Sequence, residues 1–453
     1  MSKAYKNIYF IGIGGIGMSA IARYYKFKGK NVSGYDRTPS PLTAELEKEG
    51  ISVHYEDDTD FIPKDVADTL VVYTPAIPDD LGELRYVREN GYVVIKRSRM
   101  LGEITSGQTC LAVAGTHGKT TTSTLVAHIL TESGKGCSAF LGGISKNYGT
   151  NLLVSDTPLV VAEADEFDRS FLQLHPSIAA ITAMDADHLD IYGDLAHVQE
   201  AFREFASQVK ESLIVKYGLP VTGEHTEAKI FTYHFSDPAS DFHAVNLRVD
   251  STGHFTYDLV YPAGTLNDIR VGCLGWVNVE NSIAAAAMCL TYGIDAQKVR
   301  AAINSFRGAV RRLDEHINRP GLTYIDDYAH HPEELKAAIS SVREIFPGRK
   351  LTVVFQPHLY TRTRDFAPEF AQALSLADKV ILLDIYPARE EPIPGVDSDI
   401  IFKDITSKEK VLIAKEELMD FLGREDTDVL MTCGAGNIDR YVGPITEMLE
   451  GRK

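Results

Sequence analysis

Residues 114–122, AGTHGKTTT, constrain the fold of this chain more than any other segment. An apolar run at 110–114 leads into the glycines, and a run typical of a helix follows them. A strand that passes through a glycine turn into a helix gathers backbone N–H groups around one point, which suits phosphate oxygens. Lys119 would reach the β- and γ-phosphates of a nucleotide, and Thr120 would ligate Mg²⁺. Val113 stands where the strict pattern has glycine, yet the G-K-T core favours phosphate binding over a plain turn.

A second glycine turn lies near the start of the chain. The apolar run at 7–13 leads into Gly12, Gly14 and Gly17, which match G-x-G-x-x-G. Asp36 follows about 20 residues on, where a ribose-binding acid lies in a dinucleotide fold. The spacing predicts a diphosphate at a helix N-terminus, belonging to NAD or to another ligand. Asp36 fits a ligand contact and a turn residue before Pro39 equally well.

Composition and charge exclude several classes of protein. The 453 residues carry a net charge of −17, which argues against attraction to nucleic acid or to an anionic membrane. The five cysteines lie far apart without a C-x-x-C pair, which predicts reduced, mostly buried thiols. Glycines within the apolar start disfavour a secretory helix, and no run approaches the roughly 18 apolar residues of a membrane span. We therefore expect a cytoplasmic protein without a membrane partner.

Alternating strand and helix patterns predict an α/β protein of three domains. We place the domains at 1–107, 108–312 and 313–453. The stretch 228–273 alternates polar and apolar residues, which predicts antiparallel hairpins within the second domain.

Acids and histidines follow two further strands of the second domain. Glu163 ends the apolar run at 159–164, and His188 comes soon after the run at 178–184. Ligands gather at the carboxyl ends of strands in open α/β sheets, so Glu163 could hold one Mg²⁺ and His188 a second. The neighbouring acids Asp165, Glu166 and Asp168 are typical of a solvated loop.

Seven motifs, in chain order, are similar to those of one family. AGTHGKTTT, EADE, DADHLDIYG, RRLDEH, IDDYAHHPEE, FQPHLYTRTRD and CGAGNI together resemble the Mur ligases of peptidoglycan synthesis over essentially the whole chain. THGKTT alone marks a wider superfamily that includes folylpolyglutamate synthase. GIGGIGMSAIA with FQPHLYTRTRD is narrower and resembles the alanine-adding branch. The resemblance implies a Rossmann-like first domain, a central phosphate-loop ATPase domain with a mainly parallel sheet, and a Rossmann-like third domain.

In this family the first domain holds the UDP part of a nucleotide sugar rather than NAD. The resemblance implies UDP-N-acetylmuramate as the ligand, with Asp36 near its ribose or uracil. YTPAIP at 73–78 and Arg97 resemble further contacts to this ligand. The residues expected at the site are Gly12, Gly14, Gly15, Gly17, Asp36, Thr74 and Arg97.

The resemblance also implies a reaction. ATP would phosphorylate the lactyl carboxylate of the sugar nucleotide, and the amine of L-alanine would then displace phosphate. Lys119 and His188 would act in phosphoryl transfer, with two Mg²⁺ ions held by Thr120, Glu163 and His188. GWVNVENS resembles the adenine motif, with Val277 in place of its histidine. The residues expected to bind ATP are Gly115, Thr116, His117, Gly118, Lys119, Thr120, Thr121, Asn278, Asn281 and Arg311.

The third domain would bind the amino acid. An arginine pair suits a small carboxylate because the guanidinium fork binds it through two hydrogen bonds. His330 would orient or deprotonate the ammonium group of L-alanine, and Arg362 would act beside it as a catalytic residue. The residues expected to bind L-alanine are Tyr328, His330, His358, Arg362 and Arg364.

Three other functions compete with this one. An NAD-dependent oxidoreductase explains G-x-G-x-x-G and Asp36 but not the phosphate loop. A phosphate-loop scaffold protein without chemistry would not need Lys119, Thr120, Glu163 and His188 together. Within the ligase class, a murein-tripeptide recycling ligase differs in its amino-terminal glycine segment and in its acceptor.

Overall fold

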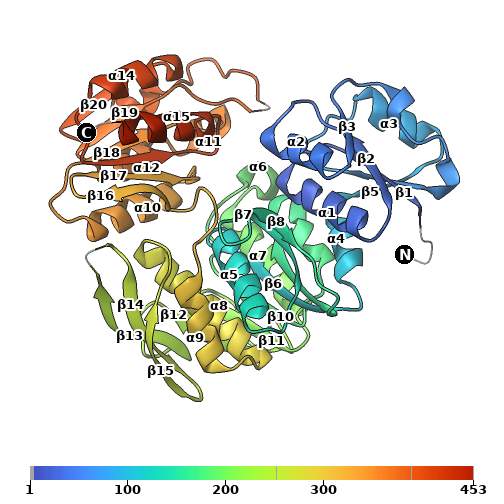
Figure 1. Cartoon of the computed structure of the whole chain (residues 1–453), viewed down its shortest axis with the longest axis horizontal. Coiled ribbons are helices and arrows are strands. Elements are labelled where there is room, and N and C mark those ends of the chain that lie inside the picture. Colours follow the sequence, from blue (N-terminus) through green and yellow to red (C-terminus); the bar gives the residue numbers. More distant parts are fainter. Residues whose placement is uncertain (1–4, 251, 389, 452–453) are drawn as a thin grey trace. The chain divides into compact units, whose positions relative to one another are not determined.

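The computed structural model describes residues 5–250, 252–388 and 390–451. Within these residues the strands form three sheets, and Figure 1 labels the elements. The chain groups into two compact units. The first holds residues up to 244 with 259–266 and 281–305, and the second holds 245–258, 267–280 and 306–453.

The amino-terminal sheet has the strand order β3-β2-β1-β4-β5, and each adjacent pair runs parallel. Its strands are β1 (Asn7–Ile11), β2 (Asn31–Tyr35), β3 (Ser52–His54), β4 (Thr69–Tyr73) and β5 (Val93–Lys96). The helices between them are α1 (Ile16–Phe27), α2 (Pro41–Lys48), α3 (Gly82–Glu89) and α4 (Arg97–Thr105). This open parallel sheet confirms the Rossmann-like prediction.

The central sheet has the order β15-β14-β13-β12-β11-β10-β6-β9-β7-β8. Its strands are β6 (Thr109–Ala114), β7 (Ser138–Ser145), β8 (Thr150–Leu153), β9 (Leu159–Ala164), β10 (Ile178–Ile181), β11 (Ser212–Lys216), β12 (Lys229–His234), β13 (Phe242–Val249), β14 (Phe255–Tyr261) and β15 (Gly264–Arg270). In the order of the sheet, the neighbouring strands β12, β11, β10, β6, β9 and β7 all pair in parallel, and β8 pairs antiparallel with β7.

One hairpin expected in this region is wrong. β12 pairs with β13 in parallel, through Tyr233 opposite Phe242 and His234 opposite His243. Seven residues separate the end of β12 from the start of β13, and both strands run in the same direction. The alternation of polar and apolar residues therefore predicted the presence of the strands correctly, but not the direction of β13 relative to β12.

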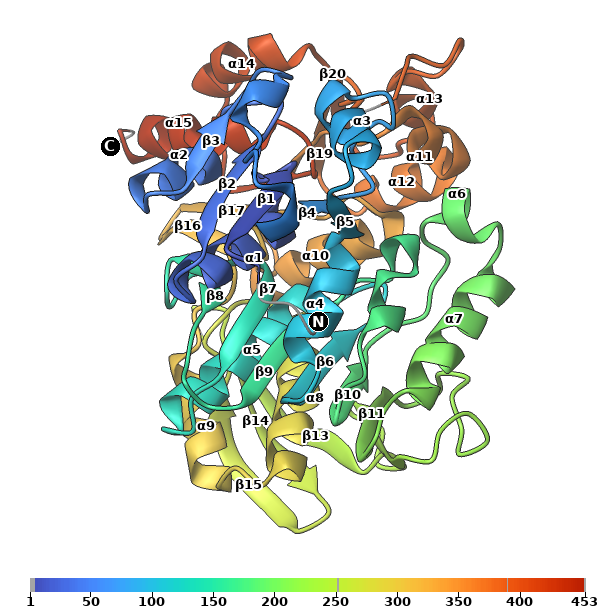
Figure 2. The same cartoon turned by 90° about the vertical axis from the view of Figure 1, so that its right-hand side faces the viewer.

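Helix α5 lies at the centre of the phosphate-loop domain. It spans Lys119–Glu132, and its residues 120–130 are buried on every side. Figure 2 shows α5 beside β6, β7 and β9, against which it packs. The other helical segments here are η3 (Phe167–Gln173), α6 (Leu189–Tyr192), α7 (Leu195–Ser207), α8 (Trp276–Tyr292) and α9 (Ala296–Ser305). Near-continuous apolar strands such as β6 are typical of a parallel sheet covered on both faces.

The carboxy-terminal sheet has the order β16-β17-β21-β18-β19-β20; β16 pairs antiparallel with β17, and the other neighbouring strands of the described residues pair in parallel. Its strands are β16 (Asp314–Arg319), β17 (Leu322–Asp327), β18 (Leu351–Phe355), β19 (Lys379–Leu382), β20 (Glu409–Leu412) and β21 (Val429–Cys433). Its helices are α10 (Pro332–Ile345), α11 (Tyr360–Asp365), α12 (Ala367–Leu374), α13 (Asp399–Phe402), α14 (Leu418–Arg424) and α15 (Asp439–Glu450).

Two expectations from composition concern the cysteines and the absence of a membrane span. All five cysteines are buried thiols, as predicted. Among the helices of the described residues, none combines the length and apolar character needed to cross a membrane.

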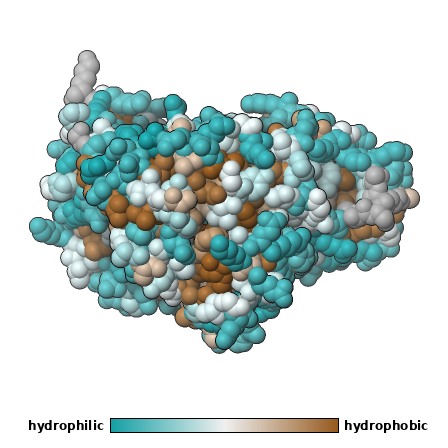
Figure 3. Space-filling view, turned by 90° about the horizontal axis from the view of Figure 1, so that it is seen from below, coloured by the Kyte–Doolittle hydropathy of each residue, from teal (hydrophilic) through white to brown (hydrophobic). Residues whose placement is uncertain are grey.

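Figure 3 views the molecule from below Figure 1, where hydrophilic residues surround smaller groups of apolar residues. An apolar pocket of about 320 Å³ is lined by the aromatic rings of Phe231, Phe242 and Tyr261.

Candidate functional site

The glycine loop between β6 and α5 has the geometry that phosphate binding requires. Gly115 and Gly118 have φ of 138° and 81°, a region that side chains with a Cβ rarely adopt. At Gly115 a Cβ would overlap the hydroxyl oxygen of Thr182, and at Gly118 it would lie 2.7 Å from the side-chain oxygen of Asn281. The strand–turn–helix predicted from the sequence is therefore present, with glycine needed at both positions.

Thr182, just after β10, holds this loop from the neighbouring strand. Its hydroxyl lies between the carbonyl oxygens of Ala114 and His117 as a shared donor. The Thr116 N–H donates to the carbonyl of Ala183 at 3.2 Å. Sequence reasoning missed Thr182, although its place after a strand next to the phosphate loop was a usable signal.

Lys119 forms a buried ion pair with Glu166. Its Nζ lies 2.8 Å from Glu166 Oε2 and donates to the Gly115 carbonyl at 2.7 Å. Burial by itself lowers the pKa of Lys119, but the carboxylates of Glu166, Asp165 and Glu163 outweigh burial and raise it. Burial likewise raises the pKa of Glu166, and Lys119 opposes that shift. The lysine is therefore a fixed cation aimed at the glycine loop.

The expectation that Glu166 is a solvated loop acid is wrong. The residue is 1% exposed, and its backbone carbonyl accepts a hydrogen bond from the Tyr192 hydroxyl at 2.6 Å. The loop turns inward here because Lys119 offers the carboxylate a buried partner. The place of Glu166 three residues after Glu163, beyond a strand end that faces the phosphate loop, was the signal available in the sequence.

Glu163 at the end of β9 faces Thr120. The Thr120 hydroxyl donates to Glu163 Oε1 at 3.1 Å, and the Gly142 N–H donates to Oε2 at 3.0 Å. A Cβ at Gly142 would overlap this carboxylate. The structure thus brings together two of the three predicted metal ligands, Thr120 and Glu163.

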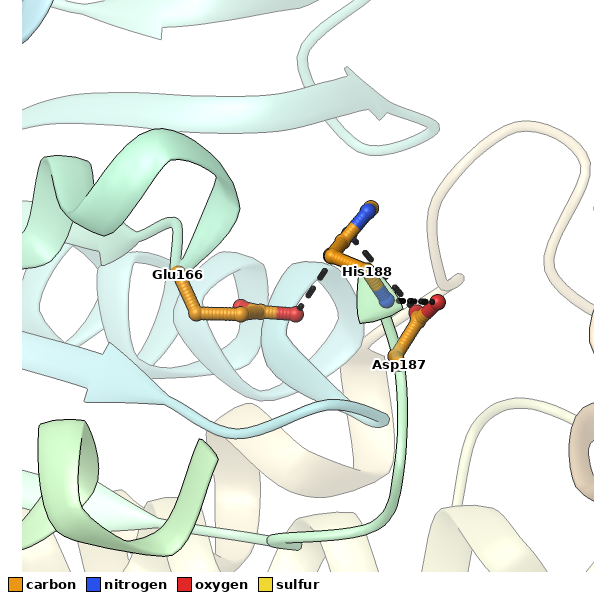
Figure 4. A group of neighbouring side chains, drawn as sticks. All are labelled: Glu166, Asp187 and His188. Carbon is orange, nitrogen blue, oxygen red and sulfur yellow. Dashed lines mark hydrogen bonds and ion pairs between the residues drawn. The ribbon is translucent and has the colours of Figure 1, made fainter. Parts of the chain in front are cut away.

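The third predicted ligand, His188, lies with Glu166 and Asp187 (Figure 4). One ligand atom from each of these residues lies within 4.8 Å of the other two. His188 Nε2 is 4.0 Å from Glu166 Oε1 and 3.7 Å from Asp187 Oδ2. His188 has a φ of 51° and the Phe167 ring lies edge-on to it, so surrounding contacts hold its backbone in a sparsely populated region. One imidazole and two carboxylates form a donor set that fits a divalent cation.

The other residues expected to bind ATP have varied surroundings. His117 pairs with Asp185 at 3.4 Å, and Thr121 is buried in α5. Asn281 accepts from the Thr122 hydroxyl at 3.4 Å, next to Gly118. In the second compact unit, the Asn278 side chain donates to the carbonyl of Leu274 at 2.6 Å.

Arg311 is engaged within the second compact unit. Its Nε donates to Asp326 at 2.7 Å, and its Nη2 donates to the carbonyl of Gly434 at 2.7 Å. Burial alone lowers the pKa of Arg311, and Asp326 more than restores it. The guanidinium edge bound to Asp326 is therefore fixed in place, and its proposed contact with ATP stays a prediction.

The amino-terminal glycine turn follows β1 and opens α1. Gly12 has a φ of 87°, and a Cβ there would lie 3.0 Å from the Thr74 methyl carbon. The Gly15 N–H donates to the carbonyl of Gly12 at 3.3 Å. The Gly14 N–H donates to Asp36 Oδ2 at 2.7 Å, while Asp36 Oδ1 accepts from the Thr38 N–H at 3.2 Å. These contacts are those expected of a turn residue, and the contact of Asp36 with a ligand stays a prediction.

Arg97 contacts both the amino-terminal glycine turn and the loop that follows β9. A Cβ at Gly17 would lie 2.9 Å from Arg97 Nη1, so the guanidinium contacts the amino-terminal turn. Its other nitrogen, Nη2, donates to Asp165 Oδ2 at 3.1 Å. The adjacent Lys96 pairs with Asp168 at 2.7 Å.

The residues expected to bind the amino acid gather at the carboxyl ends of β17 and β18. The ring centres of Tyr328 and His330 are 5.2 Å apart, and those of His330 and His358 are 5.9 Å apart. His330 Nδ1 lies 3.3 Å from Glu334 Oε2. A histidine beside a carboxylate is suited to hold a proton, which the predicted role requires.

The arginine pair is less symmetrical than the sequence suggested. Arg362 is half-buried in α11, whereas Arg364 is exposed and pairs with Asp365 at 2.7 Å. Residues two apart on a helix do not face the same way, so the two side chains leave α11 in different directions.

Asp327 ends β17 beside these histidines. Its carboxylate accepts from the N–H groups of Leu313 at 2.6 Å and Ala329 at 2.7 Å. Burial raises the pKa of Asp327 to about 6, while Arg312 and the two N–H groups oppose the shift.

Comparisons with known proteins agree over nearly the whole length. Successive family models match: "Mur ligase family, catalytic domain" at 7–109, "Mur ligase middle domain" at 113–289, and "Mur ligase, glutamate ligase domain" at 311–436. A relative from Porphyromonas gingivalis, named UDP-N-acetylmuramate–L-alanine ligase, is 51% identical, covering 98% of this chain and 99% of its own. A relative of the same name from Flavobacterium psychrophilum is 50% identical, with 98% of each chain covered.

Solved structures agree with this result. The UDP-N-acetylmuramate–alanine ligase of Thermotoga maritima aligns with a TM-score of 0.84 at 28% identity, covering 99% of this chain and 100% of that one. A murein peptide ligase from Psychrobacter arcticus shares the fold, with a TM-score of 0.72 at 20% identity and 99% of each chain covered. This chain belongs to the Mur ligase family.

Proposed function

We propose that this chain is an ATP-dependent ligase that joins L-alanine to the carboxylate of UDP-N-acetylmuramate in peptidoglycan synthesis. The observation that carries the proposal is that Glu166 contacts both Lys119 and His188, beside the carboxyl ends of the adjacent strands β10, β6 and β9, with Glu163 at the end of β9. Ligands of open α/β sheets bind at such an edge. The near-full-length identity to relatives named for this reaction supports the choice of substrates.

In the first step, a lactyl carboxylate oxygen attacks the γ-phosphorus of ATP. A bond from that oxygen to phosphorus forms, the bond to the β-phosphate oxygen breaks, and ADP leaves. Lys119 would neutralise charge on the transferred group, and its place as a buried cation at the base of the glycine loop supports this role. The backbone N–H groups of the loop and the N-terminus of α5 hold the phosphates.

Two groups of side chains fit divalent cations. Thr120 and Glu163 would hold one Mg²⁺, and His188 with Glu166 and Asp187 would hold a second. Magnesium bound there would supply positive charge against the β- and γ-phosphate oxygens. The assignment of Glu166 to this second group adds a residue to the predicted ligands.

In the second step, the alanine nitrogen attacks the acyl carbon. The C–N bond forms, the C–O bond to phosphate breaks, and the amine loses a proton. We assign the proton to His330, whose imidazole lies beside Glu334 and His358, and the carboxylate of L-alanine to Arg362. Tyr328 and His358 would border the same site. We assign the reaction to the cytoplasm, because its co-substrates are ATP and a nucleotide sugar.

A murein-tripeptide recycling ligase is the second candidate. It would use the same phosphate loop and the same nucleotide sugar with a larger acceptor, and its solved relative shares the fold of this chain. An NAD-dependent oxidoreductase is disfavoured because Mur ligase family models match all three parts of the chain, including the amino-terminal glycine turn.

Phosphate release from ATP tests the proposal. The full chain is incubated with MgATP and UDP-N-acetylmuramate, and with L-alanine, L-Ala–D-Glu–diaminopimelate or no acceptor. Release that depends on L-alanine is the expected result. Release with the tripeptide only would assign the chain to recycling, and no release with any acceptor would refute a ligase function.

A further inference from the structure

The loop that follows β9 connects two sites that the reaction uses. Glu163, at the end of β9, contacts Thr120 after the phosphate loop, and Glu166, in the loop, lies in the group with Asp187 and His188. Asp165, between them in the chain, accepts a hydrogen bond from Arg97 Nη2 at 3.1 Å. Asp165 therefore lies one residue from a buried partner of Lys119 and in contact with the arginine at the amino-terminal glycine turn.

The two terminal nitrogens of the Arg97 guanidinium have different neighbours. Nη1 faces Gly17, where a Cβ would lie 2.9 Å away, and Nη2 bonds to Asp165. The Arg97 side chain is 17% exposed and that of Asp165 is 37% exposed, so the pair is only partly screened by water. A guanidinium held at one edge presents its other edge in a fixed direction, which reduces the entropy lost when it binds a second anion.

The backbone of the loop is itself held in an uncommon conformation. Asp168 and Arg169 have φ of 54° and 53°, and two successive non-glycine residues in the left-handed region persist only where contacts hold them. Those contacts include the Lys96–Asp168 pair at 2.7 Å and the Arg169 guanidinium over the Tyr192 ring. The Asp165 Oδ1 atom also accepts from the Phe167 N–H at 3.1 Å, which fixes the carboxylate against Arg97.

We propose that Asp165 is a positioning residue for the nucleotide sugar: it holds Arg97 so that the free edge of the guanidinium faces a diphosphate at the amino-terminal glycine turn. The inference rests on the proposed function and names a residue through which the first domain receives its ligand.

The substitution Asp165→Asn tests this role with little change in shape. Asparagine keeps the side-chain oxygen that accepts from Phe167, and it removes the charge that faces Arg97. We expect the dissociation constants of UDP-N-acetylmuramate and of UDP to rise about tenfold, the scale of one charge-assisted hydrogen bond. The affinity for MgATP should not fall, because the variant removes a negative charge near Lys119.

The matched control is Asp168→Asn, which removes a carboxylate from the same loop but from its contact with Lys96 instead. Both variants and the wild-type chain are titrated by calorimetry with UDP, UDP-N-acetylmuramate and MgATP, and their thermal unfolding is compared. Selective loss of UDP-ligand affinity in Asp165→Asn, with Asp168→Asn near wild type, supports the inference.

Three outcomes would overturn it: unchanged or tighter UDP-ligand binding by Asp165→Asn, an equal loss in both variants, or an equal loss of MgATP affinity. The wild-type titration separates this failure from that of the proposed function. If wild-type protein binds no UDP ligand, the function assigned to the first domain is wrong. If it binds and Asp165→Asn binds equally well, only the role of Asp165 is wrong.

Discussion

Replacing Lys119 with methionine removes the buried ammonium group and keeps a side chain of similar length. Glu166 is then left in a site that excludes water, with its principal cationic partner gone. A buried carboxylate without a partner takes up a proton instead of remaining charged. We therefore expect Lys119→Met to be less stable than the wild-type protein and to be inactive in phosphoryl transfer.

The size of this effect follows from the protonation of Glu166. Binding a proton at pH 7 by a carboxyl whose ordinary pKa is 4.5 costs at most about 3.4 kcal/mol, at about 1.36 kcal/mol for each pH unit. At pH 5 the same step costs roughly 1 kcal/mol. A group whose folded pKa is raised destabilises the fold as pH increases, so the stability deficit of Lys119→Met should grow between pH 5 and pH 7.

Urea unfolding followed by circular dichroism at both pH values measures this deficit. The double variant Lys119→Met, Glu166→Gln is the control, because it contains neither charge. Its deficit should be smaller at pH 7 and should depend less on pH. A deficit of Lys119→Met that is equal at pH 5 and pH 7, or a double variant with the same pH dependence, would contradict the reasoning.

Three further predictions concern single residues. Gly142→Ala should displace the Glu163 carboxylate and raise the Mg²⁺ concentration needed for activity about 10- to 100-fold, as loss of an outer-shell contact does. A Mg²⁺ titration of activity measures this change, and Gly223→Ala is the control because a Cβ there meets nothing within 4 Å. Arg362→Ala should raise the KM for L-alanine more than the KM for ATP. A KM for L-alanine that equals the wild-type value would exclude Arg362 from the amino-acid site. The pKa of Asp327 is raised from 3.8 to about 6, so this carboxyl stabilises the fold below pH 4 by about 3 kcal/mol relative to pH 7, and the stabilisation is lost as pH rises through 6. Asp327→Asn should abolish the corresponding fall in unfolding free energy between pH 4 and 7, as measured by urea unfolding. An identical fall in the variant would exclude Asp327 as its source.

The sequence predicted the parallel sheets well because their signals are local. β9 begins and ends where the apolar run at 159–164 indicated, and the glycine loop at 115–118 has the turn that its residues require. Strand direction in the 228–273 stretch was harder, because polar alternation records which side chains face solvent and contains no information about the partner strand.

The candidate site was predicted in part for a similar reason. Lys119, Thr120 and Glu163 lie on regular elements whose ends are set by periodicity, so their convergence followed from the order of the strands. Glu166 was misjudged because its burial depends on an irregular loop and on a lysine 47 positions earlier in the chain. Arg97 and Asp165 are 68 positions apart, and no local pattern indicates that they meet.

The hydroxyl of Thr182 has a consequence for how a nucleotide is received. Because it ties the carbonyls of Ala114 and His117 to β10, the phosphate loop is already ordered before any ligand arrives. The conformational entropy of the loop is lost when the chain folds, not when the nucleotide binds. Amide hydrogens of the loop, such as that of Thr116, should therefore exchange slowly even in the ligand-free protein.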